Sequence, residues 1–209
     1  TVSEIADRSD NYRNTVNRVL ERFRDRGLVG TVDGHYEFNA DFNRLHAFAR
    51  ELAHHLHRQR LEAVAPKGTI LWEDYDEFLA QAETEIDAEA FHETGLARFA
   101  GFDLQFLLTG HRYYVYSEDI DAVSPAELCC HTLLIDDGSH HYSYCLLLLS
   151  HIDVDEEDLR AQAVKYGLED EIDALLSYLK THGEVDDDRL LEWDEFQELA
   201  ADYEVPLPP

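Results

Sequence analysis

Lysine, methionine and long apolar runs are what this sequence most clearly lacks. Only three of its 17 basic residues are lysines, and methionine is absent, so we expect the chain to lack its natural N-terminus. No apolar run approaches the roughly 20 residues of a membrane span, and no positively charged start precedes an apolar stretch. The sequence therefore predicts a protein with no secretion signal and no membrane partner.

Cysteine is scarce as well. The chain holds Cys129, Cys130 and Cys145, an odd number that includes two neighbours, which argues against a structural disulfide framework. This usage fits a reducing cytoplasm, where we expect the protein to reside. We predict that the three side chains are small buried thiols.

Negative charge dominates the composition. The 45 acidic residues give a formal net charge of −28. Self-repulsion on this scale opposes compaction at low ionic strength, whereas 1 M salt shortens the Debye length to about 3 Å and screens the repulsion. Because the composition resembles that of proteins from salt-loving archaea, we interpret the acidity as an adaptation to a salty cytoplasm rather than as a functional surface.

The positive charge is concentrated at one end of the chain. Residues 1–60 hold ten arginines and nine acidic residues, a net charge of +1, whereas the remaining residues carry −29. A nearly neutral, arginine-rich segment in an acidic chain indicates that something negative approaches it, and nucleic acid is the obvious candidate. The alternative is that the arginine stems cover the edges of a core.

Two helices are predicted near the start. Val2, Ile5 and Ala6 recur at helical spacing and define a short first helix. A longer helix runs from about Asn11 to Arg26 and ends at a glycine, which suits the left-handed conformation at a helix C-terminus. Its predicted buried stripe is Val16, Val19, Leu20 and Phe23.

The opposite face of the longer helix is rich in amides and guanidinium groups. Such side chains can make bidentate contacts with adenine and guanine edges in the major groove. We expect the arginines to hold phosphates or guanines and the asparagines to read bases or phosphates. The candidate DNA-binding residues of this helix are Asn11, Tyr12, Arg13, Asn14, Thr15, Asn17, Arg18 and Arg22.

A small β-hairpin is predicted after the longer helix. Two short alternating strands flank Asp33-Gly34, one of the strongest two-residue hairpin signals. We add Thr31, Gly34 and His35 to the candidate DNA-binding residues, with Thr31 and His35 touching the DNA backbone.

The segment "TVSEIADRSDNYRNTVNRVLERFRDRGLVG" resembles the winged helix-turn-helix transcription regulators of archaea and bacteria. The resemblance covers residues 1–38 and implies binding of double-stranded DNA. Such domains usually have a further helix before this point, so either the chain is truncated or the helix at 41–62 covers the exposed face. The alternative is a winged helix that is used for protein contacts only.

A long linker helix is predicted at about 41–62. Its apolar stripe either forms a homodimer or packs the winged domain on the rest of the chain; it comprises Phe42, Leu45, Phe48, Ala49, Leu52, Leu56 and Leu61. His54, His55 and His57 do not converge on one metal ion, because helical neighbours diverge by about 100°. We expect these histidines to lie on a solvated polar face.

Short strands and then helices are predicted after Pro66-Lys67-Gly68. The expected strands are 69–72 and 77–82, and 105–108 pairs with 112–116 in a hairpin, while 91–102 is helical or irregular. The expected helices are 124–135, 141–151, 155–166, 169–182 and 187–201. The predicted fold class is therefore α+β, with a winged helix-turn-helix domain at 1–40, a linker helix at 41–65 and a mainly helical regulatory or partner-binding domain with short β-hairpins at 66–209.

No catalytic or cofactor site emerges from the sequence. Cys129-Cys130-His131, with Cys145 and His140-His141, lacks the C-x2-C spacing typical of zinc sites. The acidic run 153–158 lacks the central glycine and final glutamate of a calcium loop. With no phosphate-binding glycine loop and no identifiable oxyanion site, we predict a protein that is not an enzyme and holds no metal or cofactor.

The segment "VSPAELCCHTLLI…YCLLLL…DEEDLRAQAVKYGLEDEIDALLSYL" resembles the C-terminal domain of AbiEi-type antitoxins. The resembling features are the helix start at 123–127 and the helix junction at 166–171. This resemblance implies a repressor of its own promoter that also neutralises a nucleotidyltransferase toxin. A repressor that senses a small ligand in its larger domain is the alternative.

Overall fold

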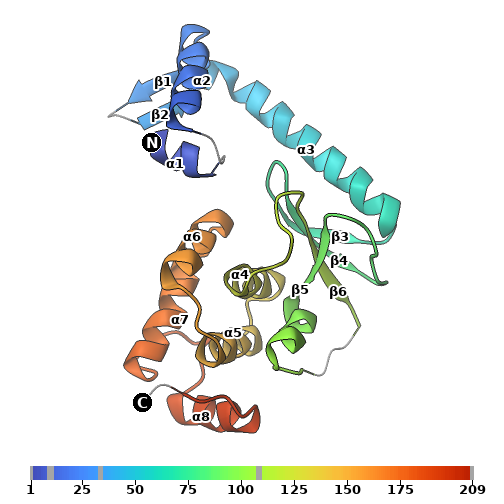
Figure 1. Cartoon of the computed structure of the whole chain (residues 1–209), viewed down its shortest axis with the longest axis vertical. Helices are drawn as coiled ribbons and strands as arrows, with labels where there is room; N and C mark the ends of the chain where they lie inside the picture. Colours follow the sequence, from blue (N-terminus) through green and yellow to red (C-terminus); the bar gives the residue numbers. More distant parts are fainter. Residues whose placement is uncertain (1, 9–11, 33–34, 107–109, 208–209) are drawn as a thin grey trace. The chain divides into compact units, whose positions relative to one another are not determined.

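The structure, a computed structural model, describes residues 2–8, 12–32, 35–106 and 110–207 (Figure 1). The chain divides into two compact units, Thr1–His55 (unit 1) and Leu56–Pro209 (unit 2). Unit 1 contains the helices α1 (Val2–Arg8) and α2 (Arg13–Asp25), the strands β1 (Val29–Val32) and β2 (His35–Phe38), a 3-10 turn η1 (Ala40–Phe42), and the first part of the long helix α3 (Asn43–Val64).

The core of unit 1 is small. Ala6, Val16 and Leu20 are buried, and Val2 and Tyr36 pack against them. The helical spacing of these residues places them on the facing sides of α1 and α2. The predicted stripe of α2 is only half correct, since Val19 and Phe23 are 37% and 38% exposed.

Asn39 joins three segments of unit 1. Its side-chain amide donates to the carbonyl oxygen of Gly27 at 2.9 Å, just after α2. Its backbone N–H donates to the Leu28 carbonyl at 2.9 Å, which closes the hairpin. Its side-chain oxygen accepts from the backbone N–H of Asp41 at 3.0 Å and caps η1. Gly27 itself has a φ of +70°, as predicted for a glycine that ends a helix.

Unit 2 contains an antiparallel sheet with the strand order β3-β4-β6-β5. The strands are β3 (Thr69–Glu73), β4 (Phe78–Ala82), β5 (Phe91–Thr94) and β6 (Arg112–Tyr116), and a 3-10 helix η2 (Gly95–Phe102) follows β5.

Two strand predictions need correction. Residues 91–94, predicted to be helical or irregular, form a strand, because β5 pairs with β6 along Phe91↔Tyr116 to Thr94↔Tyr113. The predicted hairpin between 105–108 and 112–116 is wrong, since β6 is hydrogen-bonded to β4 and β5 on its two sides. Residues 105 and 106 are not in a strand, and 107–109 lie outside the described residues.

The helices of unit 2 follow the predicted pattern closely. They are α4 (Pro125–Ile135), α5 (Ser139–His151), α6 (Glu156–Tyr166), α7 (Glu169–Thr181) and α8 (Trp193–Asp202). Ser124 and Glu127 form a reciprocal capping box at the start of α4. α8 begins later than predicted, because Asp187 accepts from the backbone and the guanidinium of Arg189 and fixes a turn before it.

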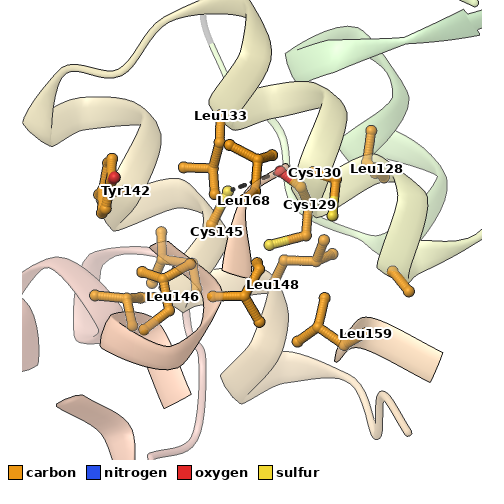
Figure 2. Close-up of a cluster of buried hydrophobic side chains, with 14 of the residues drawn as sticks. Leu128, Cys129, Cys130, Leu133, Tyr142, Cys145, Leu146, Leu148, Leu159 and Leu168 are labelled. Atoms are coloured by element: carbon orange, nitrogen blue, oxygen red, sulfur yellow. Dashed lines mark hydrogen bonds between the residues drawn. The ribbon is translucent and has the colours of Figure 1, made fainter. Parts of the chain in front are cut away.

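α4 is the centre of unit 2. It contacts α5 and α6 on one side and β3, β5 and η2 on the other. It is buried nearly all round, as expected for a helix inside a core. Figure 2 shows Leu128, Cys129, Cys130 and Leu133 among side chains of α5 and α6. The predicted α+β class is confirmed. No helix in the described part of the chain combines the length and apolarity that a membrane crossing requires.

Candidate nucleic-acid interface

The outer face of α2 presents most of the predicted DNA-binding side chains together. Arg13, Asn14, Asn17, Arg18 and Arg22 are all exposed. Asn14, Arg18 and Arg22 follow one another at i, i+4 and i+8, so they form a row along the helix. Tyr12, directly before α2, is 87% exposed, whereas Thr15 is partly buried. Asn11 lies outside the described residues.

The start of α2 is electrostatically open to an anion. Its first turn contains no acidic residue, and the side chain of Tyr12 does not cap it. By contrast, α6 and α7 each carry three acidic residues in their first turns. The N-terminus of a helix has a partial positive charge. Acidic side chains neutralise this charge in α6 and α7, whereas no acidic side chain in the first turn of α2 does so.

The arginines of α2 also differ from other cations of the chain in their partners. No carboxylate among the described side chains forms an ion pair with Arg13, Arg18 or Arg22. In unit 2, eight of the nine basic residues lie within 4.0 Å of a carboxylate oxygen: Arg58, Arg60, Lys67, Arg112, Arg160, Lys165, Lys180 and Arg189. The ninth, Arg98, lies over the ring of Phe102.

The hairpin does not bring its two candidate side chains onto one face. Thr31 pairs with Tyr36 and Val32 pairs with His35 in the antiparallel register. Directly paired residues share a face and successive residues alternate. Thr31 therefore lies on the same face as Tyr36, which packs against the core, and His35 lies on the other. Both are exposed, and the predicted contact at Gly34 lies outside the described residues.

The cysteine and histidine motifs of unit 2 form a packed core. Cys129, Cys130 and Cys145 are free and fully buried, as predicted, and the Cys145 thiol donates to the Cys129 carbonyl at 3.5 Å (Figure 2). The hydrogen bond with Cys145, together with burial, raises the pKa of Cys129, and burial raises that of Cys130. These two thiols, of Cys129 and Cys130, therefore stay protonated. The described residues include no group of three His, Cys, Asp or Glu side chains arranged to hold a metal ion.

A buried polar chain in unit 2 was not predicted from the sequence. His131 on α4 is 0% exposed; its Nδ1 lies 2.9 Å from Thr94 Oγ1 and its Nε2 lies 2.8 Å from Tyr166 Oη. Tyr166 Oη donates to Glu77 Oε1 at 2.6 Å. Lys165 Nζ lies 2.7 Å from the other oxygen of Glu77. This series of hydrogen bonds, called the buried polar chain below, joins β5, α4, α6 and the residue before β4.

The protonation states of His131 and Tyr166 in the buried polar chain follow mainly from their burial. Burial, and to a lesser extent the charge of Lys165, lowers the pKa of His131 to about 3. Burial and then the Glu77 carboxylate raise the pKa of Tyr166, so its phenol keeps its proton. Because the phenol donates to Glu77, His131 Nε2 must donate to the phenol and Thr94 must donate to Nδ1. Every member is satisfied, which is what stabilises a buried polar network.

The histidines of α3 divide between solvent and core. His54 and His55 are exposed, as expected. The prediction is wrong for His57, which is 0% exposed, lies against Phe78 with ring centroids 4.8 Å apart, and has Nδ1 3.3 Å from Glu73 Oε2. The last turns of α3 pack on the sheet, and this contact is non-local, so helical spacing alone could not reveal it.

A hollow of about 500 Å³ opens beside β5 and β6 in unit 2. Glu89, Glu118 and Asp121 line it, together with Tyr116 and His92. Three carboxylates disfavour an anionic ligand such as a nucleotide. The hollow therefore adds nothing to a nucleic-acid interface.

Comparison with known proteins identifies a matching family. A family model described as HVO_2833_C, C-terminal, matches residues 88–205, more than half of the chain. The match lies entirely within unit 2 and includes Thr94, His131, Lys165 and Tyr166 of the buried chain. No curated protein and no solved structure matches the sequence.

Proposed function

This chain belongs to the haloarchaeal HVO_2833_C family, and we propose that it is a transcriptional regulator that binds double-stranded DNA sequence-specifically through unit 1. In this proposal unit 1 acts as a winged helix-turn-helix, with α2 as the recognition helix in the major groove. The β1–β2 hairpin contacts the adjacent DNA backbone through His35.

The observation that carries the proposal is the set of exposed arginines on α2 that lack ion pairs among the described side chains. In a chain of net charge −28, an arginine has many carboxylates available as partners. In unit 2 the basic residues do pair with these carboxylates, because eight of the nine lie within 4.0 Å of a carboxylate oxygen. Guanidinium groups left open on α2 are free to bind phosphates or guanine edges.

The large acidity of unit 2 supports the same assignment. It holds nine basic and 36 acidic residues, a net charge of −27, so it repels a DNA backbone. Unit 1 holds eight basic and nine acidic residues, a net charge of −1. DNA therefore has one electrostatically accessible region of the chain to bind.

High salt determines what kind of contacts can give affinity. Each phosphate contact contributes a steep loss of affinity as salt rises. In a salty cytoplasm, affinity then depends more on base contacts and DNA shape than on phosphates. Asn14 and Asn17, which precede Arg18 on the exposed face of α2, are the amides placed to read adenine edges.

The decisive experiment is a DNA-binding titration of the full chain in high salt against genomic fragments, including its own promoter. We expect specific binding that the double variant Arg13→Ala/Arg18→Ala weakens by about tenfold or more, because a good bidentate base contact contributes about 1–3 kcal/mol.

The matched control is Arg58→Ala/Arg160→Ala, which removes the same charge from two exposed arginines that pair with Glu62 and Asp173. It should leave affinity within about twofold. Equal losses in the two double variants, or no specific binding by the folded chain, would overturn the proposal.

A protein-binding winged helix is the second candidate, favoured by the exposed apolar side chains of unit 1, such as Val32 and Phe38. In that case the arginine variants should retain full function in the cell. The antitoxin role stays a prediction of the sequence resemblance alone.

A further inference from the structure

The hollow beside β5 and β6 is a feature that DNA binding leaves unexplained. Its volume of about 500 Å³ lies within the range typical of small-molecule sites. All of its lining residues lie between positions 89 and 121 of unit 2, so unit 1 contributes nothing to its walls. The chemistry of these walls indicates what kind of molecule the hollow can bind.

The chain neutralises the negative charge of the walls only in part. Glu89, Glu118 and Asp121 contribute three carboxylates, and the lining includes no lysine or arginine. Next to it, the guanidinium of Arg60 lies 4.0 Å from Glu118 and over the ring of Tyr116, 5.0 Å from its centroid. Among the described residues, no ion pair or hydrogen bond joins Glu89 or Asp121 to another side chain. Three carboxylates and one guanidinium leave a formal charge of −2.

Arg60 shows which chemistry these walls accept. Tyr116 Oη donates to Glu118 Oε1 and holds this carboxylate beside the aromatic ring. Burial and this hydrogen bond raise the pKa of Tyr116, so the phenol keeps the proton that it donates. A guanidinium that lies beside a carboxylate and over an aromatic ring is attracted both by charge and by the ring face. The chain's own guanidinium is therefore an example of the kind of group that suits the hollow.

The carboxylates of the hollow do not converge on a metal ion. In the described part of the chain, no three His, Cys, Asp or Glu side chains are arranged to hold one. A ligand that neutralises the hollow must therefore carry its positive charges apart from each other. Ala90 and Ile120 add apolar surface to the same walls, and methylene groups between two charges can pack against such surface. These features fit an organic dication rather than an inorganic ion.

His92 adds an observation that does not depend on the carboxylates. It lines the hollow, and its Nε2 is buried without a hydrogen-bond partner among the described residues. Most buried polar atoms have a partner, so each exception calls for an explanation such as a bound ligand. An ammonium or guanidinium group has N–H donors, and the unprotonated nitrogen of a neutral imidazole accepts one. A cation in the hollow lies next to this ring and can supply the missing donor.

We propose that the hollow of unit 2 binds a small organic dication, such as a diamine or an amine that also bears a guanidinium group. Its two cationic groups pair with Glu89 and Asp121, the carboxylates that have no partner among the described side chains. Its methylene groups pack against Ala90 and Ile120. The site stands independently of DNA binding.

The first test is a calorimetric titration of the full chain with putrescine, an unbranched diamine, in the absence of DNA. Because salt screens exposed charges, the titration uses the lowest salt at which circular dichroism shows native helicity. We expect saturable binding to a single site. The double variant Glu89→Gln/Asp121→Asn should weaken binding by about tenfold or more, because it removes both ion pairs with the ligand.

Two controls separate this site from general attraction to an acidic chain. Glu198→Gln/Asp202→Asn removes two exposed carboxylates of α8 and should leave the affinity within about twofold. Butylamine has the carbon chain of putrescine but one charge, and it should bind about tenfold more weakly or less tightly still. The proposal is wrong if the folded chain shows no saturable binding, if the two double variants lose equal affinity, or if the two amines bind equally.

The second test locates the ligand by nitrogen NMR of the histidine rings. Putrescine should shift the imidazole signals of His92, which are identified by their loss in His92→Gln. The signals of His111, an exposed residue directly before β6 and at the other end of that strand from the hollow, should not move. Unshifted His92 signals at saturating putrescine would exclude the hollow as the site. Because DNA is absent from both tests, their failure leaves the DNA-binding proposal unaffected.

Discussion

In unit 2, Phe99, Tyr142 and Phe196 are fully buried, and eight of nine basic residues have carboxylate partners. In unit 1, by contrast, only Ala6, Val16 and Leu20 are buried among the residues that the structure describes. Unit 1 also leaves most of α3's stripe exposed and the arginines of α2 without an ion pair to a described carboxylate. The comparison shows that unit 2 buries its large apolar side chains and pairs its cations internally. Unit 1 instead exposes apolar side chains, and arginines unpaired among the described residues, that a binding partner could contact.

Truncating matched phenylalanines tests this contrast with the largest expected effect. Phe99→Ala in unit 2 should lower the free energy of unfolding by about 3–5 kcal/mol, because it opens a cavity in a closed core. Phe38→Ala, which removes a side chain 47% exposed in unit 1, should cost about 1 kcal/mol or less. Calorimetry in high salt measures both, and similar losses would show that unit 1 is as tightly packed as unit 2.

Acid should destabilise unit 2 through His131. Its pKa of about 3 lies below the ordinary value of 6.5, so as pH falls the unfolded chain binds the proton first. The free energy of unfolding should therefore hold above pH 6.5 and fall below it, by about 2 kcal/mol between pH 6.5 and 5.

Denaturant titrations at several pH values measure this slope. His131→Gln should lose the part of the slope due to His131, whereas His55→Gln, an exposed histidine of α3, should keep it. An unchanged slope in His131→Gln would mean that the buried imidazole does not cause the acid sensitivity.

Removing one hydroxyl from the buried chain should have a comparable or smaller effect. Tyr166→Phe takes a donor from Glu77 and an acceptor from His131, and we expect a loss of about 1–3 kcal/mol in the free energy of unfolding. Tyr178→Phe loses one bond, to the Leu191 carbonyl at 2.9 Å, and should cost about 1 kcal/mol. In guanidinium unfolding, Tyr166→Phe should have a lower midpoint concentration than Tyr178→Phe. The opposite order would contradict this prediction.

The smallest effects should come from exposed arginines. Arg160→Ala breaks a surface pair with Asp173, and such pairs contribute about 0–1 kcal/mol. Arg18→Ala has no pair with a described carboxylate to break and should change stability by less than about 0.5 kcal/mol. Thermal unfolding compares the two, and DNA affinity should fall only for Arg18→Ala. A clear destabilisation by Arg18→Ala would mean that this side chain serves the fold.

Local signals in the sequence predicted helices better than strand partners. The capping box of Ser124 and Glu127 spans three residues, and the helix that it starts was found where predicted. The partners of β6 were mispredicted because pairing joins distant segments: Tyr116 lies opposite Phe78 on one side and Phe91 on the other. No spacing rule within a short window encodes such pairings.

The same division holds for the candidate sites. The exposed row on α2 follows from a helical period of 3.6 residues, so Asn14, Arg18 and Arg22 could be grouped from the sequence. The buried polar chain could not, because Tyr166 and Glu77 are 89 residues apart. The only local signal is His131 beside Cys129 and Cys130 on α4. The sequence analysis rejects these residues as a zinc motif because the C-x2-C spacing is absent, and nothing in their spacing indicates a hydrogen-bonded core.

The three hydrogen bonds of Asn39 have a mechanical consequence for unit 1. Its side chain and backbone tie the end of α2, the base of the hairpin and the start of η1 to one residue. A displacement of strand β2 is therefore transmitted through Asn39 to the residues that end α2.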